Sequence, residues 1–569
     1  MGQCSDQGRK PVNQDFHGLY VPDGPQRGSK GIAIALADGI GSSEVSQIAS
    51  ETAVRSFLED YFCTSDAWSV KKSAQRVLMA INHWLHSHTR NSRYCEDQDR
   101  GYVCTVSTMV LKSTVAHIFH VGDSRIYRVA GRSLEQLTED HRVWLSRHES
   151  YLGRALGVKA QVEIDYRAVP LDSGDVFVLA TDGVYEHVTA DEMTGAIAMH
   201  ESDLDEAARH IVSTAYDQGS TDNLTVQILR VDQLATEDAG ELHQRLAELA
   251  IPPELEPRTQ FDGYEIVRKI HASTRSHVYL ARERDTGALV ALKTPSTELA
   301  QDPIGLERFL LEEWVARRID NPHVLKPHAP ERKRSYLYVA MEYVEGQSLT
   351  QWMRDHPKAD IERVRALVEQ VARGLRAFHR QEMLHRDLRP DNILIDSSGT
   401  AKIADFGSTR VAGIAEASSR MDPPDQLGTE QYSAPEYFMG EEATDRSDIF
   451  SLGVVTYQML TGQLPYGTAV AQVRTRAGRN KLRYSPVFEH NRAVPAWING
   501  ALRQAVHPDP ERRYEDVDEL VHDLRHPRKE HLHETRPPLV ERNPELFWKS
   551  VSAILALTSL VLVVLLRSQ

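Results

Sequence analysis

The stretch His385-Arg386-Asp387-Leu388-Arg389-Pro390-Asp391-Asn392, together with the later Asp405-Phe406-Gly407, decides the fold of the second half of this sequence. Four β-rich runs before it predict strands, and the amphipathic run Ile361–His379 predicts a helix. Strands first and helices afterwards indicate a domain with a β-rich part and a helical part. The predicted strands are Glu265–Ile270, His277–Arg282, Leu289–Lys293 and Tyr336–Tyr343.

The first half of the sequence has a different pattern. Short β-rich runs alternate with helical stretches, and turns with Asp-Gly or Gly-Asp separate them. We expect a mixed fold of helices and largely antiparallel strands. The predicted strands are Gly31–Ala37, Thr108–Leu111, Val115–Val121, Val176–Ala180 and Leu224–Leu229, and the predicted helices are Val45–Tyr61, Lys72–His88 and Asp203–Asp217.

Length and local composition divide the chain. A sequence of 569 residues is too long for one core, so two or three domains are expected. The segment between the two patterned halves is charged at first and then rich in proline, which predicts a linker. We expect a first domain over 1–231, a linker over 232–261, a second domain over 262–526, a juxtamembrane spacer over 527–545 and an apolar segment over 546–566.

Charge and cysteine content narrow the class of protein. The formal net charge is −15, and acidic and basic residues are interspersed. Because binding to a phosphate backbone requires a basic face, this balance argues against nucleic acid as a partner. The four cysteines, Cys4, Cys63, Cys95 and Cys104, lack Cys-x-x-Cys spacing, which argues against a disulfide framework or a zinc site and favours a reducing cytosol.

An uncharged apolar run lies near the C-terminus. As a helix, Val551–Leu566 would extend roughly 24 Å and the longer segment 546–566 about 31 Å, close to the thickness of a bilayer core. Trp548 and Lys549 suit a membrane interface, so we expect a single transmembrane helix over 546–566, with a buried C-terminal helix as the alternative. Basic residues are more numerous before this segment than after it. The large domains are therefore expected in the cytoplasm, at a cell inner membrane, with the lipid bilayer as a partner.

The second domain resembles the eukaryotic-like (Hanks-type) Ser/Thr protein kinases over roughly its whole length. The resemblance rests on Val290-Ala291-Leu292-Lys293, on the two stretches quoted first, and on Gly428–Glu436, which ends in Ala-Pro-Glu. An ordered set of this kind is far more specific than a lone Asp-Phe-Gly. It implies a bilobal protein-kinase fold that transfers phosphate from ATP to Ser or Thr of proteins.

The kinase resemblance assigns roles to single residues. Lys293 would grip the α- and β-phosphates of ATP, with Glu312 as its helix partner and Glu313 as the alternative. Asp387 would accept the proton of the substrate hydroxyl or orient that hydroxyl, while Asn392 and Asp405 would hold Mg²⁺. The other implied positions are Arg389 in the catalytic loop, Ile270, Val278, Met341, Glu342 and Val344 around the nucleotide, and the structural anchors Asp448 and Arg513, with Arg513 paired to Glu436.

Two places depart from the kinase pattern. Where the family has Gly-x-Gly-x-x-Gly-x-Val, this chain has His271–Val278 without a glycine. Glycines let the backbone approach the phosphates closely. Arg389 stands where the family usually has lysine, which keeps the charge but not the compact geometry. A nucleotide-binding pseudokinase is therefore the alternative to an active kinase.

The first domain resembles the metal-dependent PP2C-type Ser/Thr protein phosphatases over about residues 1–231. A single Asp-Gly pair is an ordinary turn, so the order of five acidic positions carries this resemblance. It implies a β-sandwich flanked by helices and a site where hard oxygen ligands hold two Mg²⁺ or Mn²⁺ ions that activate water. The five positions lie in Asn13-Gln14-Asp15, Asp38-Gly39, Gly122-Asp123, Asp182-Gly183 and Asp222-Asn223.

The phosphatase resemblance also assigns metal ligands. Asp38 would bridge two metals, and Gly39 would give a backbone carbonyl. Asp15 would act largely through metal-bound water. Asp182 and Asp222 would complete the set, and Asp123 would hold a weaker third metal together with Asp182.

Two positions depart from the phosphatase pattern. The arginine that grips phosphate in the family is Lys10 here, and the adjacent Arg9 could take its place. The histidine that follows Asp-Gly in many members is Ile40, so protonation of the leaving group would fall to another group.

Taken together, the sequence predicts a multidomain α+β protein similar to bacterial fusions of the two enzymes. Its cofactors would be ATP with Mg²⁺ in the kinase, and two or three Mn²⁺ or Mg²⁺ ions in the phosphatase. Its partners would be proteins bearing Ser or Thr, or their phosphorylated forms, including its own activation loop with Ser418 and Ser419. The alternatives are an active phosphatase with an ATP-sensing pseudokinase domain and a non-enzymatic membrane scaffold.

Overall fold

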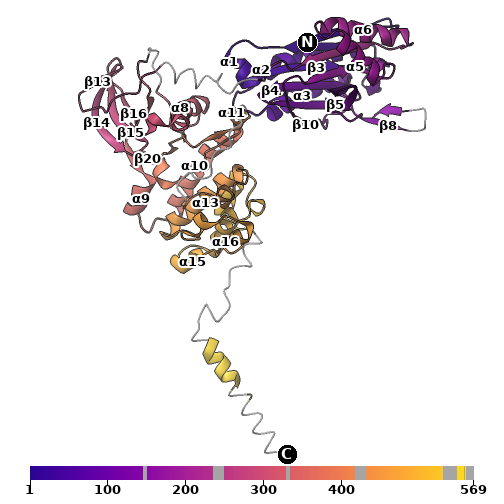
Figure 1. Cartoon of the computed structure of the whole chain (residues 1–569). Helices are drawn as coiled ribbons and strands as arrows, with labels where there is room; N and C mark the ends of the chain where they lie inside the picture. Colours follow the sequence, from indigo (N-terminus) through magenta and orange to yellow (C-terminus); the bar gives the residue numbers. More distant parts are fainter. Residues whose placement is uncertain are drawn as a thin grey trace, which may run out of the picture. The chain divides into compact units, whose positions relative to one another are not determined.

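The computed structural model describes residues 1–144, 150–234, 249–328, 334–416, 431–528, 547–555 and 558. The chain folds into two units, which Figure 1 colours along the sequence. The first unit contains Met1–Glu248 and also Val411–Arg420. The second unit contains Leu249–Arg410 and Met421–Gln569.

Two five-stranded antiparallel sheets form the centre of the first unit. One has the order β1-β12-β11-β6-β7 and the other the order β10-β5-β4-β3-β2. Inner strands such as β3, β5, β11 and β12 are buried on both faces, which explains their continuous apolar runs. The strands are β1 (Gly2–Asp6), β2 (Phe16–Tyr20), β3 (Ile32–Ala37), β4 (Val106–Lys112), β5 (Val115–Val121), β6 (Arg125–Ala130), β7 (Ser133–Gln136), β10 (Asp165–Pro170), β11 (Val176–Ala180) and β12 (Leu224–Arg230), with a separate pair β8 (Arg142–Trp144) and β9 (Ser150–Leu152).

Helices pack against these sheets and close the first unit. Helices α2 and α3 pack beside the sheet that contains β3, and α5 and α6 pack beside the sheet that contains β12. A third apolar core, which includes Ile34, Ile118 and Phe177, draws on strands of both sheets. The helices are α1 (Pro25–Lys30), α2 (Ser46–Cys63), α3 (Val70–Arg90), α4 (Asp182–Tyr185), α5 (Ala190–Met199) and α6 (Leu204–Asp217).

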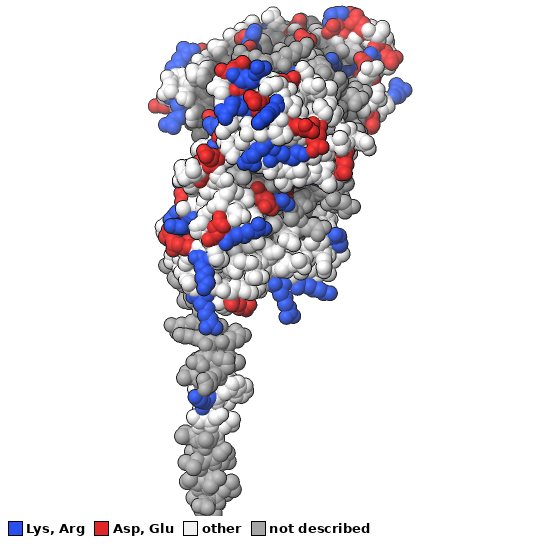
Figure 2. All heavy atoms as spheres, turned by 90° about the vertical axis from the view of Figure 1, so that its left-hand side faces the viewer, with Lys and Arg blue, Asp and Glu red and all other residues white. Residues whose placement is uncertain are grey.

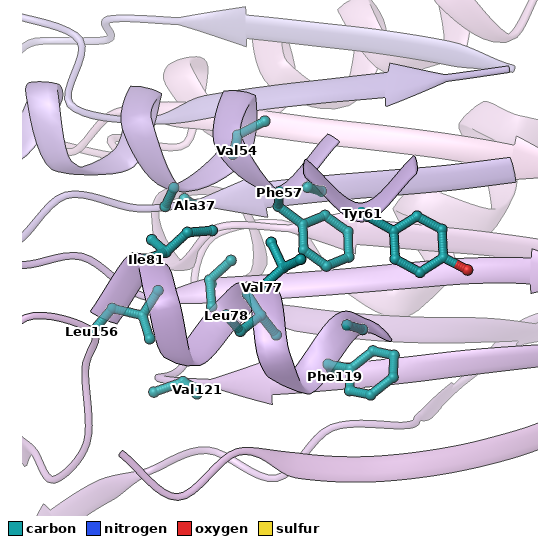
Figure 3. Packing of buried hydrophobic residues seen from close by; sticks show 14 of the residues in the cluster. Ala37, Val54, Phe57, Tyr61, Val77, Leu78, Ile81, Phe119, Val121 and Leu156 are labelled. Carbon is teal, nitrogen blue, oxygen red and sulfur yellow. The ribbon is translucent and has the colours of Figure 1, made fainter. Parts of the chain in front are cut away.

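The core beneath α2 and α3 shows how side chains hold these layers together. Aromatic residues of α2 and aliphatic residues of α3 meet over the strands of one sheet (Figure 3). Every member of this core is less than a tenth exposed, so contacts here are lost in full when a side chain is shortened. Figure 3 labels Phe57 and Tyr61 from α2, Val77, Leu78 and Ile81 from α3, and Phe119 and Val121 from β5.

The second unit has a β-rich part followed by a helical part. Its larger sheet has the order β13-β14-β15-β16-β17, and a smaller sheet has the order β18-β20-β21. Helix α10 packs against α13 and α17 in the helical part. The strands are β13 (Gln260–Phe261), β14 (Tyr264–Ala272), β15 (Ser276–Glu283), β16 (Leu289–Pro295), β17 (Val339–Glu342), β18 (Gly346–Ser348), β19 (Met383–Leu384), β20 (Ile393–Asp396), β21 (Ala401–Ile403) and β22 (Arg410–Val411). The helices are α8 (Pro303–Arg318), α9 (Leu349–Asp355), α10 (Ile361–Arg380), α12 (Pro435–Met439), α13 (Asp445–Thr461), α14 (Arg476–Arg479), α15 (Val487–His490), α16 (Ala496–Ala505) and α17 (Val517–Arg525).

A buried ion pair anchors the helical part of the second unit. Arg513 donates through both terminal nitrogens to the Glu436 carboxylate, at 2.6 and 2.8 Å. The side chains are 0% and 1% exposed, so neither charge can turn to water. Removing one partner of such a pair costs about 3–5 kcal/mol, because the other charge stays buried.

Charges of both signs are scattered over the visible surface (Figure 2). Figure 2 shows Lys and Arg side chains interspersed with Asp and Glu. Exposed ion pairs such as Arg93 with Glu44 and Lys326 with Asp320 are each worth at most about 1 kcal/mol. The buried cores therefore contribute far more to stability than the surface charges do.

The predicted elements agree well with those observed. Strands β5 and β11 have the predicted limits, and α10 ends one residue beyond the predicted helix Ile361–His379. The predicted strand Tyr336–Tyr343 shortens to β17. The predicted domain limits stay predictions.

The predicted transmembrane helix over 546–566 is wrong for the part of the chain that the structure describes. There, no helix is both long and apolar enough to cross a bilayer. The helical residues 547–555 fall short of the roughly 20 residues that a span needs, and they include Lys549. The rest of the predicted segment, apart from residue 558, lies outside the described residues.

Replacing Leu78 by alanine tests the core shown in Figure 3. Leu78 is fully buried, so Leu78→Ala should lower the free energy of unfolding of the first unit by about 2–5 kcal/mol. The neighbouring Met79 is 52% exposed, so Met79→Ala should change it by about 0.5 kcal/mol or less. Differential scanning calorimetry of the full chain measures both, and equal losses would contradict this packing.

Candidate functional site

Three charged side chains of the second unit meet at one point. The Lys293 ammonium, on β16, donates to Glu312 Oε2 of α8 at 2.7 Å and to Asp405 Oδ1 at 3.1 Å. Burial opposes the charge of Lys293, but Asp405 and Glu312 outweigh it and raise the pKa of Lys293. The same ammonium lowers the pKa of Asp405. Glu313, the alternative partner, instead accepts hydrogen bonds from Arg334.

A buried carboxylate holds the loop that begins at His385. Asp448, on α13, accepts hydrogen bonds from the backbone N–H groups of His385 and Arg386 at 2.9 Å each. His379 Nε2 lies 3.1 Å from the same carboxylate. Arg386 has a φ of 66°, a conformation that residues other than glycine rarely adopt. Asp448 therefore stabilises a strained turn next to Asp387.

Asp387 and Asn392 lie together in this loop. Asn392 Nδ2 donates to the Asp387 carbonyl oxygen at 2.9 Å and to Asp387 Oδ2 at 3.1 Å. The fully buried Phe406 contacts the rings of Phe378 and His385. This packing fixes the backbone of the adjacent Asp405, so the two predicted magnesium ligands are held by separate structural devices.

The remaining positions predicted for the second unit lie in strands β14, β15 and β17, after β17, and in the loop that contains Asp387. Arg389 lies 3.2 Å from Asp391, with which it forms an ion pair. In the sheet, Val278 lies opposite Lys293, and Ile270 lies in a β-bulge of β14 and is 40% exposed. Met341 is buried in β17, Glu342 accepts a hydrogen bond from Lys402 at 2.6 Å, and Val344 follows the strand.

The glycine-free stretch 271–278 contains the turn between β14 and β15. The backbone N–H of Ser273 donates to the Ser276 carbonyl at 2.9 Å, and Ser273 Oγ accepts from the Ser276 N–H at 3.1 Å. No residue of this stretch has a positive φ. The turn therefore does not require the conformational freedom of glycine, and a serine hydroxyl closes it instead.

In the first unit, Asp15 is buried between two strands. Its Oδ2 accepts hydrogen bonds from Thr181 Oγ1 at 3.0 Å and from Thr225 Oγ1 at 2.7 Å. Its Oδ1 is buried and has no hydrogen-bond partner among the described residues. The two hydroxyls thus orient one oxygen of the carboxylate and leave the other for a ligand.

The five predicted aspartates lie close enough to affect one another. Burial, followed by the charges of Asp15, Asp182, Asp123 and Asp222, raises the pKa of Asp38 well above its ordinary value. Burial also raises the pKa of Asp15 to about 6 and that of Asp182 to about 7. These carboxylates therefore repel one another at neutral pH.

The backbone at Gly39 approaches its neighbours closely. A Cβ atom at this position would lie 2.8 Å from the Gln14 carbonyl oxygen, to which the Gly39 N–H donates at 3.1 Å. A side chain would force the loop at Asp38 away from the loop at Asp15, so glycine is required here.

Basic side chains neutralise three of the acids in part. Lys10 lies 2.9 Å from Asp222 Oδ1, while Arg142, on β8, lies 2.7 Å from Asp123 Oδ2 and 3.1 Å from Asp182 Oδ2. Arg9 instead donates to the carbonyl oxygens of Tyr216 and Gly219. Of the two predicted phosphate-binding residues, Lys10 therefore faces the acids and Arg9 does not.

The acidic set suits divalent cations by its chemistry. All its side-chain donors are carboxylate oxygens, the ligands that Mg²⁺ and Mn²⁺ prefer. Across the described part of the chain, no three His, Cys, Asp or Glu side chains stand in a preformed metal geometry. Cations would nevertheless relieve the repulsion among these acids and use the unpartnered Asp15 Oδ1. The residues present therefore fit such ions.

Sequence reasoning missed three residues that shape this site. Thr181 and Thr225 precede or follow predicted aspartates in the chain and orient Asp15. Arg142 follows His141 in the chain, and no motif there indicates a role for the arginine. Only the fold brings β8 to Asp123 and Asp182.

Two family models match the chain. Residues 264–524 match the model described as protein kinase domain, and residues 5–225 match the model described as protein phosphatase 2C. Together these matches cover the residues of both clusters described above. The kinase match includes Lys293 and Asp405, and the phosphatase match includes Asp15 and Asp222.

Several curated relatives named as serine/threonine-protein kinases match a little under half of the chain. The probable serine/threonine-protein kinase PknB of Lactococcus lactis is 28% identical over 266 residues, which is 46% of this chain and 42% of that protein. The serine/threonine-protein kinase PrkC of Bacillus subtilis is 30% identical over 268 residues, 46% of this chain and 40% of that protein. The chain thus spans less than half the length of these relatives.

A solved structure is also similar. The PknI kinase domain of Mycobacterium tuberculosis shares 27% sequence identity, and the match covers 48% of this chain and 98% of that one. The TM-score is 0.37.

Metal and pH should have opposite effects on the stability of the first unit. The raised pKa values of Asp15 (about 6) and Asp182 (about 7) mean that the stabilising contribution of these two groups is complete below about pH 4 and is lost as the pH rises through about 6 to 7. The pKa of Asp38 is raised in the same direction by burial and by the neighbouring carboxylates. In EDTA, Asp38→Asn should therefore raise the Tm by about 2–4 °C or more near pH 8 and have little effect near pH 5. Manganese should raise the Tm of the wild-type protein and not that of this variant.

The exposed Asp191, on α5, provides the control for this measurement. Calorimetric scans of Asp191→Asn should match the wild type at every pH and metal concentration. A wild-type Tm that is insensitive to manganese would contradict a cation site among these aspartates.

Proposed function

Because the chain joins a protein phosphatase 2C domain to a protein kinase domain, we propose that it is a bifunctional signalling enzyme. One domain would transfer phosphate from ATP to Ser or Thr of proteins, and the other would remove phosphate from such residues. The observation that carries the kinase half is the contact of Lys293 with both Glu312 and Asp405. The carboxylate set around Asp38 supports the phosphatase half.

In the kinase domain, each residue has a task that follows from its position. Lys293 would bind the phosphates of ATP, because Glu312 and Asp405 keep its ammonium charged and in place. Asp387, held by the loop that Asp448 anchors, would accept or orient the proton of the substrate hydroxyl. Asn392 and Asp405 would hold Mg²⁺, which supplies charge neutralisation at the transferred phosphate.

In the phosphatase domain, the aspartates would hold Mn²⁺ or Mg²⁺. When bound, such ions neutralise the phosphate and acidify a water molecule. Asp15, Asp38, Asp182 and Asp222 would be the ligands, with the carbonyl oxygen of Gly39. The hydroxyls of Thr181 and Thr225 would keep Asp15 in its ligating orientation. Lys10, beside Asp222, would bind the phosphate oxygens of the substrate. A third ion at Asp123 would compete with Arg142.

The pseudokinase alternative receives no support from the geometry. Its basis in the sequence was the missing glycine loop, but the turn at Ser273 is closed without any positive φ. The ion pair of Lys293 and Glu312 is also intact. A scaffold without activity would not need these buried charges, since each carries a desolvation cost.

The substrates of both reactions would be proteins, including this chain itself. We expect the activation loop around Ser418 and Ser419 to be phosphorylated by the kinase domain and dephosphorylated by the phosphatase domain. Both serines lie outside the described residues. A linker of about thirty residues would give the two domains a high effective concentration.

Two single substitutions should separate the activities. Asp387→Asn should lower transfer of labelled phosphate from ATP by at least about 100-fold and leave manganese-dependent hydrolysis of p-nitrophenyl phosphate unchanged. Asp38→Asn should abolish the hydrolysis and preserve the transfer. Label that persists in the Asp387→Asn protein would refute the assignment of the kinase base. If the Asp38→Asn protein, in which the phosphatase cannot remove the label, also takes up no labelled phosphate, the result would point to the pseudokinase.

The exposed Asp355 and Asp191 serve as matched controls for the kinase and phosphatase domains. Their Asp→Asn variants should keep both activities. Mass spectrometry of the Asp38→Asn protein should find more phosphate on the activation loop than on the wild-type loop.

A further inference from the structure

The segment that follows Asp405-Phe406-Gly407 in the kinase sequence belongs to the first unit. That unit includes Val411–Arg420, of which residues 411–416 are described. The segment leaves strand β22, forms the short helix α11 (Ala412–Ala415) and continues to Glu416. The first part of the kinase activation loop is therefore packed among residues of the phosphatase unit.

The Glu416 carboxylate lies at the N-terminus of helix α3 and accepts hydrogen bonds there. The backbone N–H of Val70 donates to both carboxylate oxygens, at 3.0 and 3.2 Å. Val70 is the first residue of α3, where N–H groups have no partner within the helix and the helix dipole favours an anion. The Lys112 ammonium lies 3.3 Å from Glu416 Oε2. A helix N-terminus and an ammonium thus converge on one carboxylate.

Lys112 is the buried charged residue of this site. It is the last residue of β4, and its side chain is 1% exposed. Its ammonium donates to the Gly413 carbonyl at 2.6 Å and to the Glu416 carboxylate. Burial lowers the pKa of Lys112, and Glu416 acts against that shift. Because a buried ammonium needs partners, the segment supplies what Lys112 requires.

Gly413 fits the site because it lacks a side chain. Its N–H donates to the Ala67 carbonyl oxygen at 3.0 Å. A Cβ atom at this position would lie 2.2 Å from the Asp66 carbonyl oxygen and 2.8 Å from that of Trp68. Such distances are far below van der Waals contact, so any larger residue would displace the segment.

We propose that Lys112, the N-terminus of α3 and the Ala67 carbonyl form a docking site on the phosphatase domain, whose occupant is the activation-loop segment Gly413–Glu416 of the same chain. With this segment docked, Lys293 contacts both Glu312 and Asp405, and Phe406 is buried. The structure thus holds the docked segment and the Lys293 cluster at the same time, and the proposal includes that docking supports phosphoryl transfer. This last step rests on the kinase activity proposed above.

Hydrogen–deuterium exchange of the full-length protein tests the docking directly, with no need for activity. Glu416→Gln removes the negative charge that faces Lys112, and Lys112→Met removes the ammonium. Gly413→Ala adds a methyl group that would clash with the Asp66 and Trp68 carbonyl oxygens. In each variant, the amides of residues 412–416 should exchange about tenfold faster than in the wild type, because a hydrogen bond to a charged group is lost or the segment is displaced. Lys112→Met combined with Glu416→Gln should add little to either single change.

Matched controls distinguish docking from general loosening. Glu345 is exposed, and a Cβ atom at Gly195 meets no atom within 4 Å, so Glu345→Gln and Gly195→Ala should leave this exchange unchanged. Two of the three docking variants lie in the loop segment and not in the core, so they remain informative if Lys112→Met fails to fold.

Activity of the same proteins tests the consequence. Transfer of phosphate from ATP to an added protein substrate should fall about tenfold in Glu416→Gln and Gly413→Ala, while hydrolysis of p-nitrophenyl phosphate stays at the wild-type rate. Unchanged exchange in these variants would overturn the docking site. If the amides exchange faster while the rate of phosphate transfer from ATP is unchanged or higher, the claim that docking supports the kinase would be overturned. A wild type without any transfer would instead reject the proposed kinase activity, and exchange would still report on docking.

Discussion

The need of buried charges for partners governs how both domains are built. An ionised group taken out of water is strongly destabilising unless an opposite charge or several hydrogen bonds accompany it. In the kinase domain, Lys293, Arg513 and Asp448 each have such partners within the domain. These three contacts fix, in turn, the lysine proposed to bind nucleotide, the Glu436 end of the predicted activation loop and the loop that contains Asp387. The residues predicted to act in catalysis are therefore positioned by interactions that also stabilise the domain.

In the phosphatase domain, the buried charges are only partly compensated by protein groups. Its aspartates outnumber the basic groups that reach them, and their pKa values rise because burial and mutual repulsion favour the neutral form. Lys10 and Arg142 compensate only part of this charge. A site left under-compensated in this way would favour divalent cations, and one oxygen of Asp15 has no hydrogen-bond partner among the described residues. Without metal, the repulsion among these aspartates destabilises the phosphatase domain, and we expect bound cations to relieve it. In the kinase domain, by contrast, the charges of the cluster at Lys293 are balanced by side chains of the domain itself.

The sequence predicted the features that depend on local pattern or on ordered motifs. Apolar runs located β5 and β11, and the order of acidic turns located the aspartates that the fold brings together. It could not predict Arg142 or Thr225, because these reach Asp123 and Asp15 through long-range packing that leaves no local signal. Hydropathy over 546–566 predicted a membrane span, but hydropathy reports transfer from water and not the length of helix that forms; in the described residues none is long enough. The missing glycines at 271–278 pointed to a pseudokinase, but the turn there contains no residue in the left-handed region and so does not require glycine.

The contact between Glu416 and Lys112 connects these two ways of handling charge. Lys112 resembles the kinase lysine in being buried and paired, yet its partner comes from a segment more than three hundred residues away in the chain. Lys112 depends on Gly413 and Glu416 for its partners, so in the proposed docking the activation-loop segment supplies the charge that the buried ammonium needs. If the proposed activities are both present, this dependence would link them physically within one chain. Removal of the activation-loop segment would leave a buried ammonium without its carboxylate, and the first unit would lose stability as a result.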